Sequence, residues 1–569
     1  MYRIRSFVSN QQLRMSLKLP KLFLYLLGSI LVLNLLQAHF TALIFDEAYY
    51  WLYSKNMAWG YFDHPPMVAL LIKLSSFLFE GELGVRFVGC LLSTGTYIVL
   101  WFSIDNPAKN KFVTHFIVLV FSMTLMNAYG FFTLPDTALL FFTALFLLVY
   151  KRFIKTPSFV LALTLGIIMA ALMYSKYHAI LVIFFVLLSN LKLVFNKYAW
   201  VAVFIALLCY IPHFLWLFEN DFISIKYHLI ERPNAAYNFN KFTLGFMVNL
   251  VAIFGLTFPF VYYTLYKSRY KDLFDKALIY LTYGVLIFFF ISSFHRRVQT
   301  QWIIVICIPI TILVFNFIIE NGNVRKWIYR LGLLNIAVIL FLRIGLIYEP
   351  VSPVFYETHG NKAWIAEIQS KVGDNPVVIE NSYRNASMYA FYTGNTSFSL
   401  NNINYRQNQY SMDDSEDAVQ HKKVFYISKY LNKKEFTFPK KDGGIYYGHF
   451  IENFESFRKL RCYVNDEKFT MNNEEYQVKV HNPYSKNIAL KKLRFAIAFL
   501  NDVKDLEELV PIELISENDN LFELKSNDTT FFKFKLPQPK ITKSPEFFKI
   551  VISENGLRHG LNSHAIKLN

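Results

Sequence analysis

Two neighbouring carboxylates, Asp46 and Glu47, follow the first long apolar segment of the sequence and precede a run of aromatic residues. Further along, Asp63 and His64 stand before two prolines. Carboxylates at a bilayer surface are costly unless they are hydrated or paired, so they indicate a function. An ionised carboxylate can act as a general base and remove a proton from a hydroxyl group. The alternative, solvated loop acids beside an interfacial aromatic belt, stays open on these residues alone.

Cations that could stabilise a departing phosphate are spread over other loops between apolar segments: Arg86, Lys176, Arg232, Arg296 and Arg297. Arginine offers a planar fork suited to phosphate oxygens, whereas lysine acts as a point charge. Lys176 has few other charges near it in the sequence, which favours it for this role. Arg86 has a structural alternative, because it could pair with Glu82 or Asp136 and hold helices together.

Asp136 follows Pro135 at a turn, where it could serve a catalytic site or simply cap the following helix. Four further residues, Asp63, His64, His228 and His295, are of types that bind metals, but no spacing typical of a metal site connects them. The sequence therefore assigns no cofactor and leaves a divalent metal open.

The composition places these residues in a membrane protein. Of 569 residues, 54% are hydrophobic and only 17% are charged, against about 25% charged in an average soluble domain. The 58 Phe and 36 Tyr exclude a disordered chain, and four Cys exclude a disulfide scaffold. A transmembrane helix needs about 20 mostly apolar residues. Eleven segments meet this criterion approximately: 22–41, 84–103, 112–130, 134–150, 158–174, 177–195, 199–218, 243–266, 277–294, 302–319 and 327–347.

The net charge of +17 is a second signal of topology. With the N-terminus in the cytoplasm, the inner loops hold 19 Lys and Arg against four acids, and the outer loops and spans hold ten of each. Residues 350–569 add only +2. This distribution follows the positive-inside rule and indicates a basic cytoplasmic side, so the charge does not indicate nucleic-acid binding. A membrane protein with a cytoplasmic N-terminus and an extracytoplasmic C-terminal domain is expected.

Three domains are expected, a transmembrane domain over 1–349 and two parts of an extracytoplasmic domain. Residues 350–456 alternate helical and strand-like patterns and predict a small α/β subdomain. Residues 457–569 carry period-two runs, among them Tyr476–His481, Leu493–Ala498 and Phe548–Ile552, which predict a β-sandwich-like subdomain.

Several sequence blocks, taken in order, resemble one enzyme superfamily. The blocks are Asp46-Glu47, Tyr61-Phe-Asp-His-Pro-Pro66, Glu82-Leu-Gly-Val-Arg86, Leu134-Pro-Asp136, Ser175-Lys-Tyr177, Glu219-Asn-Asp221 with His228 and Arg232, Arg297-Val-Gln-Thr-Gln-Trp302, Glu380-Asn-Ser-Tyr-Arg-Asn-Ala-Ser387 and Tyr405-Arg-Gln-Asn-Gln-Tyr410. The set resembles the bacterial GT-C glycosyltransferases of the dolichyl-phosphate-mannose protein mannosyltransferase and aminoarabinose transferase superfamily (glycosyltransferase families 39 and 83).

The resemblance implies a GT-C fold of about eleven transmembrane helices, an active site on the outer face and a polyprenyl (undecaprenyl) phosphate sugar as donor. It implies Asp46 as the base with Glu47 beside it. Donor phosphate binding then falls to Lys176, Arg86, Arg232 and Arg297, and a supporting role at the donor or acceptor site to Asp63, His64, Asp136 and His228. The lipid A branch carries a Glu-Lys pair where this chain has Asp63-His64, which leaves an aminoarabinose specificity toward lipid A in doubt.

We therefore expect an inverting transferase that moves a hexose or pentose to an extracytoplasmic glycolipid such as lipid A, a glycan or a protein. The alternative is a multispan transporter or flippase for a lipid-linked sugar. Transporters carry midplane charges and internal repeats, whereas the acids here collect in the outer loops and no repeat is evident.

Overall fold

A computed structural model of the chain describes residues 19–231, 235–431, 435–464, 469, 475–516, 521–541 and 545–568. These residues form two compact units. The helical unit comprises the chain up to Ala42 together with Pro65–Phe214 and Tyr237–Val354. The mixed unit comprises Leu43–His64, Leu215–Ala236 and Phe355–Asn569. Two loops that interrupt the helical part of the sequence thus belong to the same unit as the C-terminal residues.

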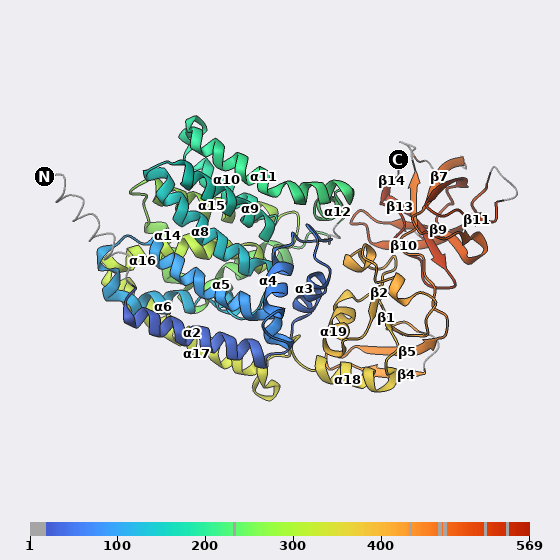
Figure 1. Cartoon of the computed structure of the whole chain (residues 1–569), viewed down its shortest axis with the longest axis horizontal. Coiled ribbons are helices and arrows are strands. Elements are labelled where there is room, and N and C mark those ends of the chain that lie inside the picture. Colours follow the sequence, from blue (N-terminus) through green and yellow to red (C-terminus); the bar gives the residue numbers. More distant parts are fainter. Residues whose placement is uncertain are drawn as a thin grey trace. The chain divides into compact units, whose positions relative to one another are not determined.

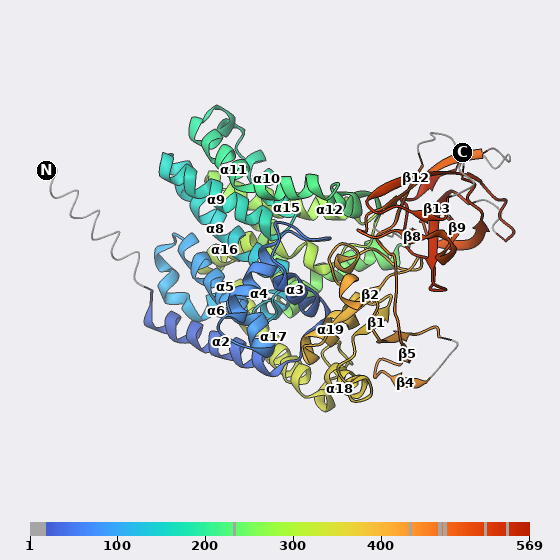
Figure 2. The same cartoon turned by 45° about the vertical axis from the view of Figure 1, so that its right-hand side comes forward.

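Helices make up nearly all of the helical unit, and α2 and α17 lie side by side in Figures 1 and 2. Its helices are α2 (Lys21–Phe40), α4 (Met67–Ser76), α5 (Gly81–Ser103), α6 (Val113–Phe121), α7 (Thr124–Ala128), α8 (Pro135–Lys155), α9 (Phe159–Ser175), α10 (Ala179–Leu188), α11 (Lys197–Glu219, its last turn in the mixed unit), α13 (Gly245–Phe254), α14 (Phe258–Lys267), α15 (Leu273–Ser292), α16 (Cys307–Glu320) and α17 (Gly322–Ile347).

All eleven predicted segments contain helix, but the count of eleven spans is not confirmed. Seven helical segments of the described chain are long and apolar enough to cross a membrane. The other candidates are shorter: α9, α10 and α16 have 17, 10 and 14 residues. The predicted segment 112–130 is broken between α6 and α7, where Ser122 ends the first helix. An apolar run long enough to span is therefore not always one continuous helix.

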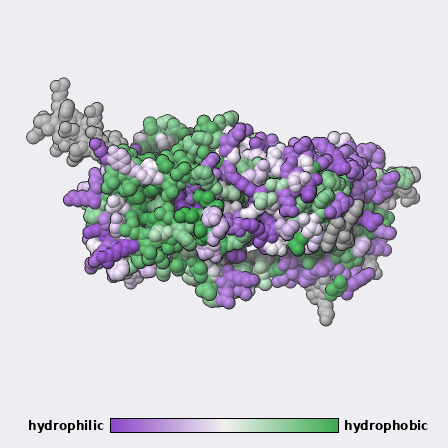
Figure 3. Space-filling view, turned by 90° about the horizontal axis from the view of Figure 1, so that it is seen from below, coloured by the Kyte–Doolittle hydropathy of each residue, from purple (hydrophilic) through white to green (hydrophobic). Residues whose placement is uncertain are grey.

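The surface of the helical unit is apolar, as a membrane-spanning bundle requires. Figure 3 shows hydrophobic residues covering much of this unit on the face in view, with hydrophilic residues at one end. Large exposed apolar side chains occur along α2, α11, α15 and α17, among them Phe204, Leu208, Ile287 and Leu334. In a soluble protein so extended an apolar face would be buried against other parts of the protein. In a membrane, lipid tails cover it.

The first part of the mixed unit combines three short helices of the loops with an α/β layer. The loop helices are α3 (Phe45–Lys55), α12 (Ile223–Lys226) and the π-type turn η3 (Tyr227–Glu231). The layer has α18 (Asn361–Val372), α19 (Tyr383–Thr393) and five strands in the order β2-β1-β3-β5-β4. Their bounds are β1 (Val377–Glu380), β2 (Ser397–Leu400), β3 (Val424–Ser428), β4 (Phe436–Pro439) and β5 (Ile445–Ile451). Strands β2, β1 and β3 are parallel and fully buried, which explains the continuous apolar runs Val377–Ile379 of β1 and Val424–Ile427 of β3.

The second part of the mixed unit is antiparallel and strand-rich, which confirms the predicted C-terminal architecture. One sheet has the order β10-β9-β13-β14, a second has the order β12-β7-β6, and β11 pairs with β8. The bounds are β6 (Arg461–Val464), β7 (Glu475–Asn482), β8 (Ile488–Ala489), β9 (Leu493–Leu500), β10 (Leu506–Ile512), β11 (Glu523–Leu524), β12 (Asp528–Lys535), β13 (Phe547–Glu554) and β14 (Ile566–Lys567). Alternate apolar side chains of both sheets form one core.

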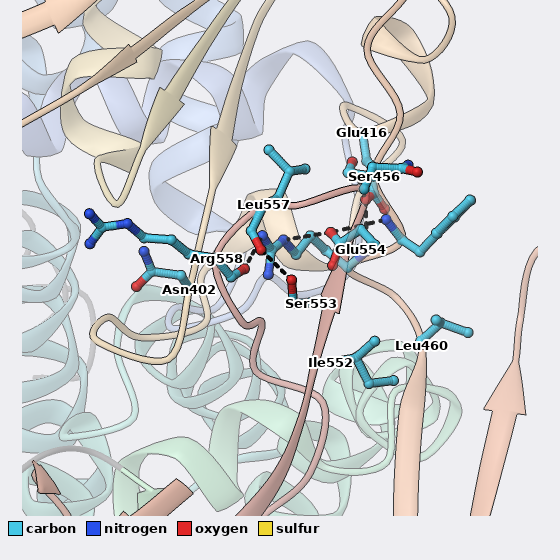
Figure 4. Close-up of polar contacts among 12 residues, drawn as sticks. Asn402, Glu416, Ser456, Leu460, Ile552, Ser553, Glu554, Leu557 and Arg558 are labelled. Atoms are coloured by element: carbon cyan, nitrogen blue, oxygen red, sulfur yellow. Dashed lines mark hydrogen bonds and ion pairs between the residues drawn. The ribbon is translucent and has the colours of Figure 1, made fainter. Parts of the chain in front are cut away.

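Two buried carboxylates and one arginine connect the two parts of the mixed unit (Figure 4). Glu416 accepts hydrogen bonds from the Ser456 hydroxyl at 2.7 Å and from the Tyr484 hydroxyl at 2.6 Å. Arg458 Nε lies 3.1 Å from Glu554 Oε1 at the end of β13. Burial, partly offset by the charge of Arg458 and reinforced by that of Glu416, raises the pKa of Glu554 from 4.5 to about 7.

Substituting Glu554→Gln should remove one pH-dependent contribution to stability. Because the folded state raises this pKa, it binds more protons than the unfolded state between about pH 4.5 and 7, and stability falls as pH rises through that window. Across that window the native protein should lose on the order of 3 kcal/mol of stability through Glu554. Hydrogen exchange of the β13 amides, corrected for intrinsic rates, measures it. Glu554→Gln should flatten the dependence and the exposed control Glu507→Gln should not; an unchanged slope in Glu554→Gln contradicts the assignment.

Candidate functional site

The carboxylates of Asp46 and Glu47 lie in the first turn of α3, where helix geometry favours negative charge. Unpaired backbone N–H groups and the helix dipole give an N-terminus partial positive charge. Glu47 is completely buried, and its Oε2 accepts a hydrogen bond of 3.3 Å from the Ile44 N–H. Asp46, one position earlier, points elsewhere, with 42% of its side chain accessible. Of the two acids, Asp46 is therefore the one that an incoming molecule can reach.

Asp46 lies beside an arginine from the α/β layer. Arg384, in the first turn of α19, places its Nη2 3.9 Å from Asp46 Oδ1, and half of the Arg384 side chain is exposed. Protein atoms surround the carboxylate although one side stays open. Burial therefore raises the pKa of Asp46; the charge of Arg384 lowers it, and the nearby Asp63 raises it. The result is an accessible carboxylate with more affinity for a proton than an ordinary aspartate.

Asp63, unlike Asp46, is buried and has several partners within the protein. Its Oδ1 accepts a hydrogen bond of 2.5 Å from the Tyr53 hydroxyl, and its Oδ2 lies 3.5 Å from Arg406 Nη1. Its main-chain carbonyl is 2.8 Å from His228 Nε2. Burial acts to raise the pKa of Asp63, but the positive charges of His64 and Arg406 and the hydroxyl of Tyr53 together lower it. Asp63 thus stays ionised and fixed in place.

Tyrosine rings connect these charged groups into one wall. The Tyr49 ring lies 4.8 Å from the Tyr53 ring and 4.4 Å from the Tyr383 ring, and Tyr53 stacks on Tyr61 at 4.2 Å. The Arg406 guanidinium lies 4.8 Å from the centre of the Tyr383 ring. Aromatic faces attract cations and exclude water, so this wall holds the arginine close to Asp63.

A second acid–base pair of residues borders the same carboxylates. Burial, followed by the charge of Asp46, raises the pKa of Glu357 to about 7. Burial lowers the pKa of Lys440 to about 8, and its ammonium donates a hydrogen bond of 3.0 Å to Asn385 Oδ1. The same ammonium lies 4.5 Å from the centre of the Phe45 ring, next to Asp46 in sequence. Perturbed pKa values of this kind cluster at functional sites.

The helical unit contains a separate buried ion pair. Lys176 Nζ lies 2.7 and 2.9 Å from the two oxygens of Asp136, and the side chains expose only 6% and 4% of their surface. Asp136 is in the first turn of α8, while the Leu134 N–H is bound by the hydroxyl of Thr137. Asp136 therefore pairs with Lys176 rather than capping the helix through its own side chain.

The remaining predicted residues have different surroundings. Arg86 is completely buried, and its guanidinium donates hydrogen bonds to the carbonyls of Ala38, Thr41 and Ala42 at the end of α2. These bonds to the end of α2 support the structural alternative for Arg86, in which its guanidinium holds helices together. Arg297 is exposed, just before the 3-10 turn η6 (Thr300–Trp302). Arg232 lies outside the described residues.

The structure thus brings together five of the predicted residues in the mixed unit: Asp46, Glu47, Asp63, His64 and His228. Four others, Arg86, Asp136, Lys176 and Arg297, belong to the helical unit.

Sequence reasoning missed Arg384, Arg406, Glu357 and Lys440 as site residues. The first two lie in the blocks Glu380–Ser387 and Tyr405–Tyr410, which the sequence had singled out without assigning chemistry to them. No group of three His, Cys, Asp or Glu in the described part of the chain is arranged to hold a metal ion.

Comparison with known proteins supports the resemblance expected from the sequence blocks. The family model of dolichyl-phosphate-mannose-protein mannosyltransferases matches residues 63–216. The chain is also similar to the lipid A galacturonosyltransferase RgtD of Rhizobium johnstonii, with 25% identity over 288 residues. That match covers 47% of this chain, and the chain spans 59% of the relative's length.

The fold has a structural relative among solved proteins. The crystal structure of ArnT from Cupriavidus metallidurans, bound to undecaprenyl phosphate, matches with a TM-score of 0.56 at 12% identity. The match covers 75% of this chain and 97% of that one. The chain is a multispan helical membrane protein with the GT-C fold and a strand-rich C-terminal domain. In particular, its fold is ArnT-like.

Substituting Arg384→Gln should shift the pH dependence of any activity that uses Asp46 as a base. The guanidinium lowers the pKa of Asp46, so its loss raises that pKa further, and the acidic limb of the pH–rate profile should move to higher pH. Arg384→Lys should restore part of the shift. Arg494→Gln, which removes an exposed arginine on β9, is the matched control. An acidic limb that stays in place in Arg384→Gln would show that Asp46 does not set it.

Proposed function

We propose that the chain is an inverting membrane glycosyltransferase of the bacterial inner membrane. It would move a sugar from a polyprenyl phosphate to an extracytoplasmic acceptor, a glycolipid of the lipid A type. The observation that carries the proposal is the accessible carboxylate of Asp46, recessed among protein atoms and placed 3.9 Å from Arg384. The match to a lipid A galacturonosyltransferase and the ArnT-like fold support it.

The reaction follows from the chemistry of a single displacement. The acceptor hydroxyl oxygen forms a bond to the anomeric carbon of the donor sugar while the bond from that carbon to the phosphate oxygen breaks. Asp46 accepts the proton of the hydroxyl group, and polyprenyl phosphate leaves with the bonding electron pair. Attack from the face opposite the leaving group inverts the configuration at the anomeric carbon. Positioned base catalysis contributes about 10²- to 10⁴-fold in rate.

Two further residues of the mixed unit, Arg384 and Asp63, would assist Asp46. The charge of Arg384 acts to lower the pKa of Asp46, and its exposed half offers a donor fork to a phosphate oxygen. Asp63, bound by Tyr53 and Arg406, fixes the loop that carries Asp46 and adds negative charge that strengthens its basicity. Stabilisation of charge on the leaving group is usually the largest catalytic contribution.

In the helical unit, Lys176 and Arg297 remain proposals for donor phosphate binding. Lys176 is held by Asp136, so it would present a cation whose position is already set before the donor arrives. Arg86, with its guanidinium committed to three carbonyls, is better suited to holding α2 in place.

The direct test compares the purified wild type with Asp46→Asn. In detergent, with a polyprenyl-phosphate sugar and lipid A, the variant should lose transfer by about 10²- to 10⁴-fold because its amide cannot accept the proton. Asp502→Asn, which changes an exposed aspartate between β9 and β10, is the control and should keep full activity. Transfer by Asp46→Asn at the wild-type rate would exclude this residue as the base. Wild type that transfers from no polyprenyl-phosphate sugar to any glycolipid would exclude the proposed activity.

A further inference from the structure

A cavity of about 220 Å³ lies within the helical unit, among α8, α9, α10 and α11, which are neighbours in Figures 1 and 2. It is located where α10 ends at Leu188 and the chain turns through the 3-10 helix η2 (Leu191–Phe195) before α11 begins at Lys197. Helix α10 has only 10 residues, about 15 Å of helix, whereas α8 and α11 have 21 and 23 residues. The short helix therefore leaves space beside its longer neighbours.

The walls of this cavity are apolar and closely packed. Phe153 of α8, Leu187 of α10 and Val203 of α11 are among the residues that line it, and no Asp or Glu is among the described lining residues. Helices α9 and α11 approach each other so closely that a Cβ added at Gly166 would lie 2.6 Å from the Ala202 carbonyl oxygen. Buried water needs several polar partners, so an apolar chain is the occupant that these walls favour.

Three exposed cations border the cavity. Arg152, Lys192 and Lys197 each lie within two positions of a lining residue, and none of them forms an ion pair within the described part of the chain. The Lys197 ammonium lies 5.3 Å from the centre of the neighbouring Tyr198 ring, a contact that leaves its charge in place. Asp105 pairs with two other lysines of α8. The border of the cavity therefore attracts an anion.

The turn between α10 and α11 has the residues of a membrane–water interface. The Trp200 indole N–H donates a hydrogen bond of 2.8 Å to the Val194 carbonyl, which ties η2 to the first turn of α11. The rings of Phe195 and Trp200 are exposed beside Lys192 and Lys197. Tryptophan and basic residues are typical of the depth at which lipid head groups meet their acyl chains. The cavity thus combines an apolar interior with an interfacial, basic border.

This cavity is distant from the groups proposed to bind the donor. Asp136, the partner of Lys176, is in the first turn of α8, and Tyr150, which lines the cavity, is in the last two turns. About 20 Å of helix separates the two positions. A phosphate bound by Lys176 and an anion bound at Lys192 would therefore belong to two different molecules, at opposite ends of α8.

We propose that the cavity holds one acyl chain of an anionic phospholipid whose phosphate lies against Arg152, Lys192 and Lys197. Burial of the chain among the four helices supplies affinity, and the three cations supply the preference for a negative head group. The bound lipid fills the space beside the short α10 and connects it with α8 and α11. This site goes beyond the proposed function, because it needs neither donor nor acceptor.

The experiment measures phospholipid binding to the purified full-length protein. Wild type, delipidated in detergent, is titrated with phosphatidylglycerol and with phosphatidylcholine of the same acyl chains, and native mass spectrometry gives the dissociation constant of the first bound lipid. Wild type should bind phosphatidylglycerol at least about tenfold more tightly, because three cations attract its net negative head group. Lys192→Gln/Lys197→Gln should lose most of this preference and bind phosphatidylcholine as wild type does.

The substitution Ala199→Phe tests the cavity itself. Ala199 is half-buried and lines the cavity, so a phenyl ring there would take the place of the acyl chain. The variant should bind both phospholipids at least about tenfold more weakly although all three cations remain. Its far-UV circular dichroism and elution volume should match those of wild type. If they do not, the exposed lysine pair alone decides the outcome.

The matched control is Lys111→Gln/Lys326→Gln, which removes two exposed lysines of the helical unit outside the cavity lining. It should bind both phospholipids like wild type. A wild type with equal affinity for the two lipids would overturn the inference, and so would an undiminished preference in Lys192→Gln/Lys197→Gln or wild-type binding by a folded Ala199→Phe. Displacement of phosphatidylglycerol by an equal concentration of undecaprenyl phosphate would assign the cavity to the donor and also overturn it. Loss of sugar transfer would leave the inference standing.

Discussion

The site of the mixed unit depends on the pairing of Asp63 with Arg406. A carboxylate as deeply buried as that of Asp63 is costly unless a positive charge and hydrogen-bond donors accompany it. Here the guanidinium of Arg406 and the hydroxyl of Tyr53 provide them. Because Asp63 belongs to a loop near the N-terminus and Arg406 to the C-terminal part, their pairing holds the two segments in one compact unit. The hydrogen bond from the Gln409 N–H to the Tyr49 hydroxyl and the pair of Asp46 with Arg384 join α3 to the same C-terminal segment.

The two aspartates of this loop have opposite environments, and that difference separates their roles. Asp63 has its donors within the protein, and its pKa is lowered. Asp46 is reachable and has a pKa raised above its usual range. One carboxyl group is therefore a fixed negative charge, and the other can take up a proton. Enzymes that use paired carboxyl groups commonly separate them in this way, by environment rather than by residue type.

The principal elements of the fold were well predicted from sequence, because burial in lipid and in a protein core leaves different patterns. The apolar segments became helices, and the alternating runs 476–481, 493–498 and 548–552 became the strands β7, β9 and β13. The number of spans was less secure, since a helix can break inside an apolar run, as at Ser122, without any change in hydropathy. Helix capping was the local alternative for Asp136, but its carboxylate pairs with Lys176, a residue 40 positions away that no local pattern connects to it.

The sequence by itself determined that the chain is a multispan membrane protein with a strand-rich C-terminal domain. This conclusion follows from length, hydropathy and local spacing, which adjacent residues carry. Asp46 became the candidate base through the resemblance of its sequence block to a known family. Only the tertiary structure decided which cations face the carboxylates. The hydroxyl of Tyr49, for example, accepts a hydrogen bond from the Gln409 N–H, 360 positions further along the chain. Arg384 and Arg406 belong to the same C-terminal part of the chain as Gln409 and lie beside Asp46 and Asp63. A charge pair depends on distance in space, and no local pattern encodes the distance between residues so far apart in the chain.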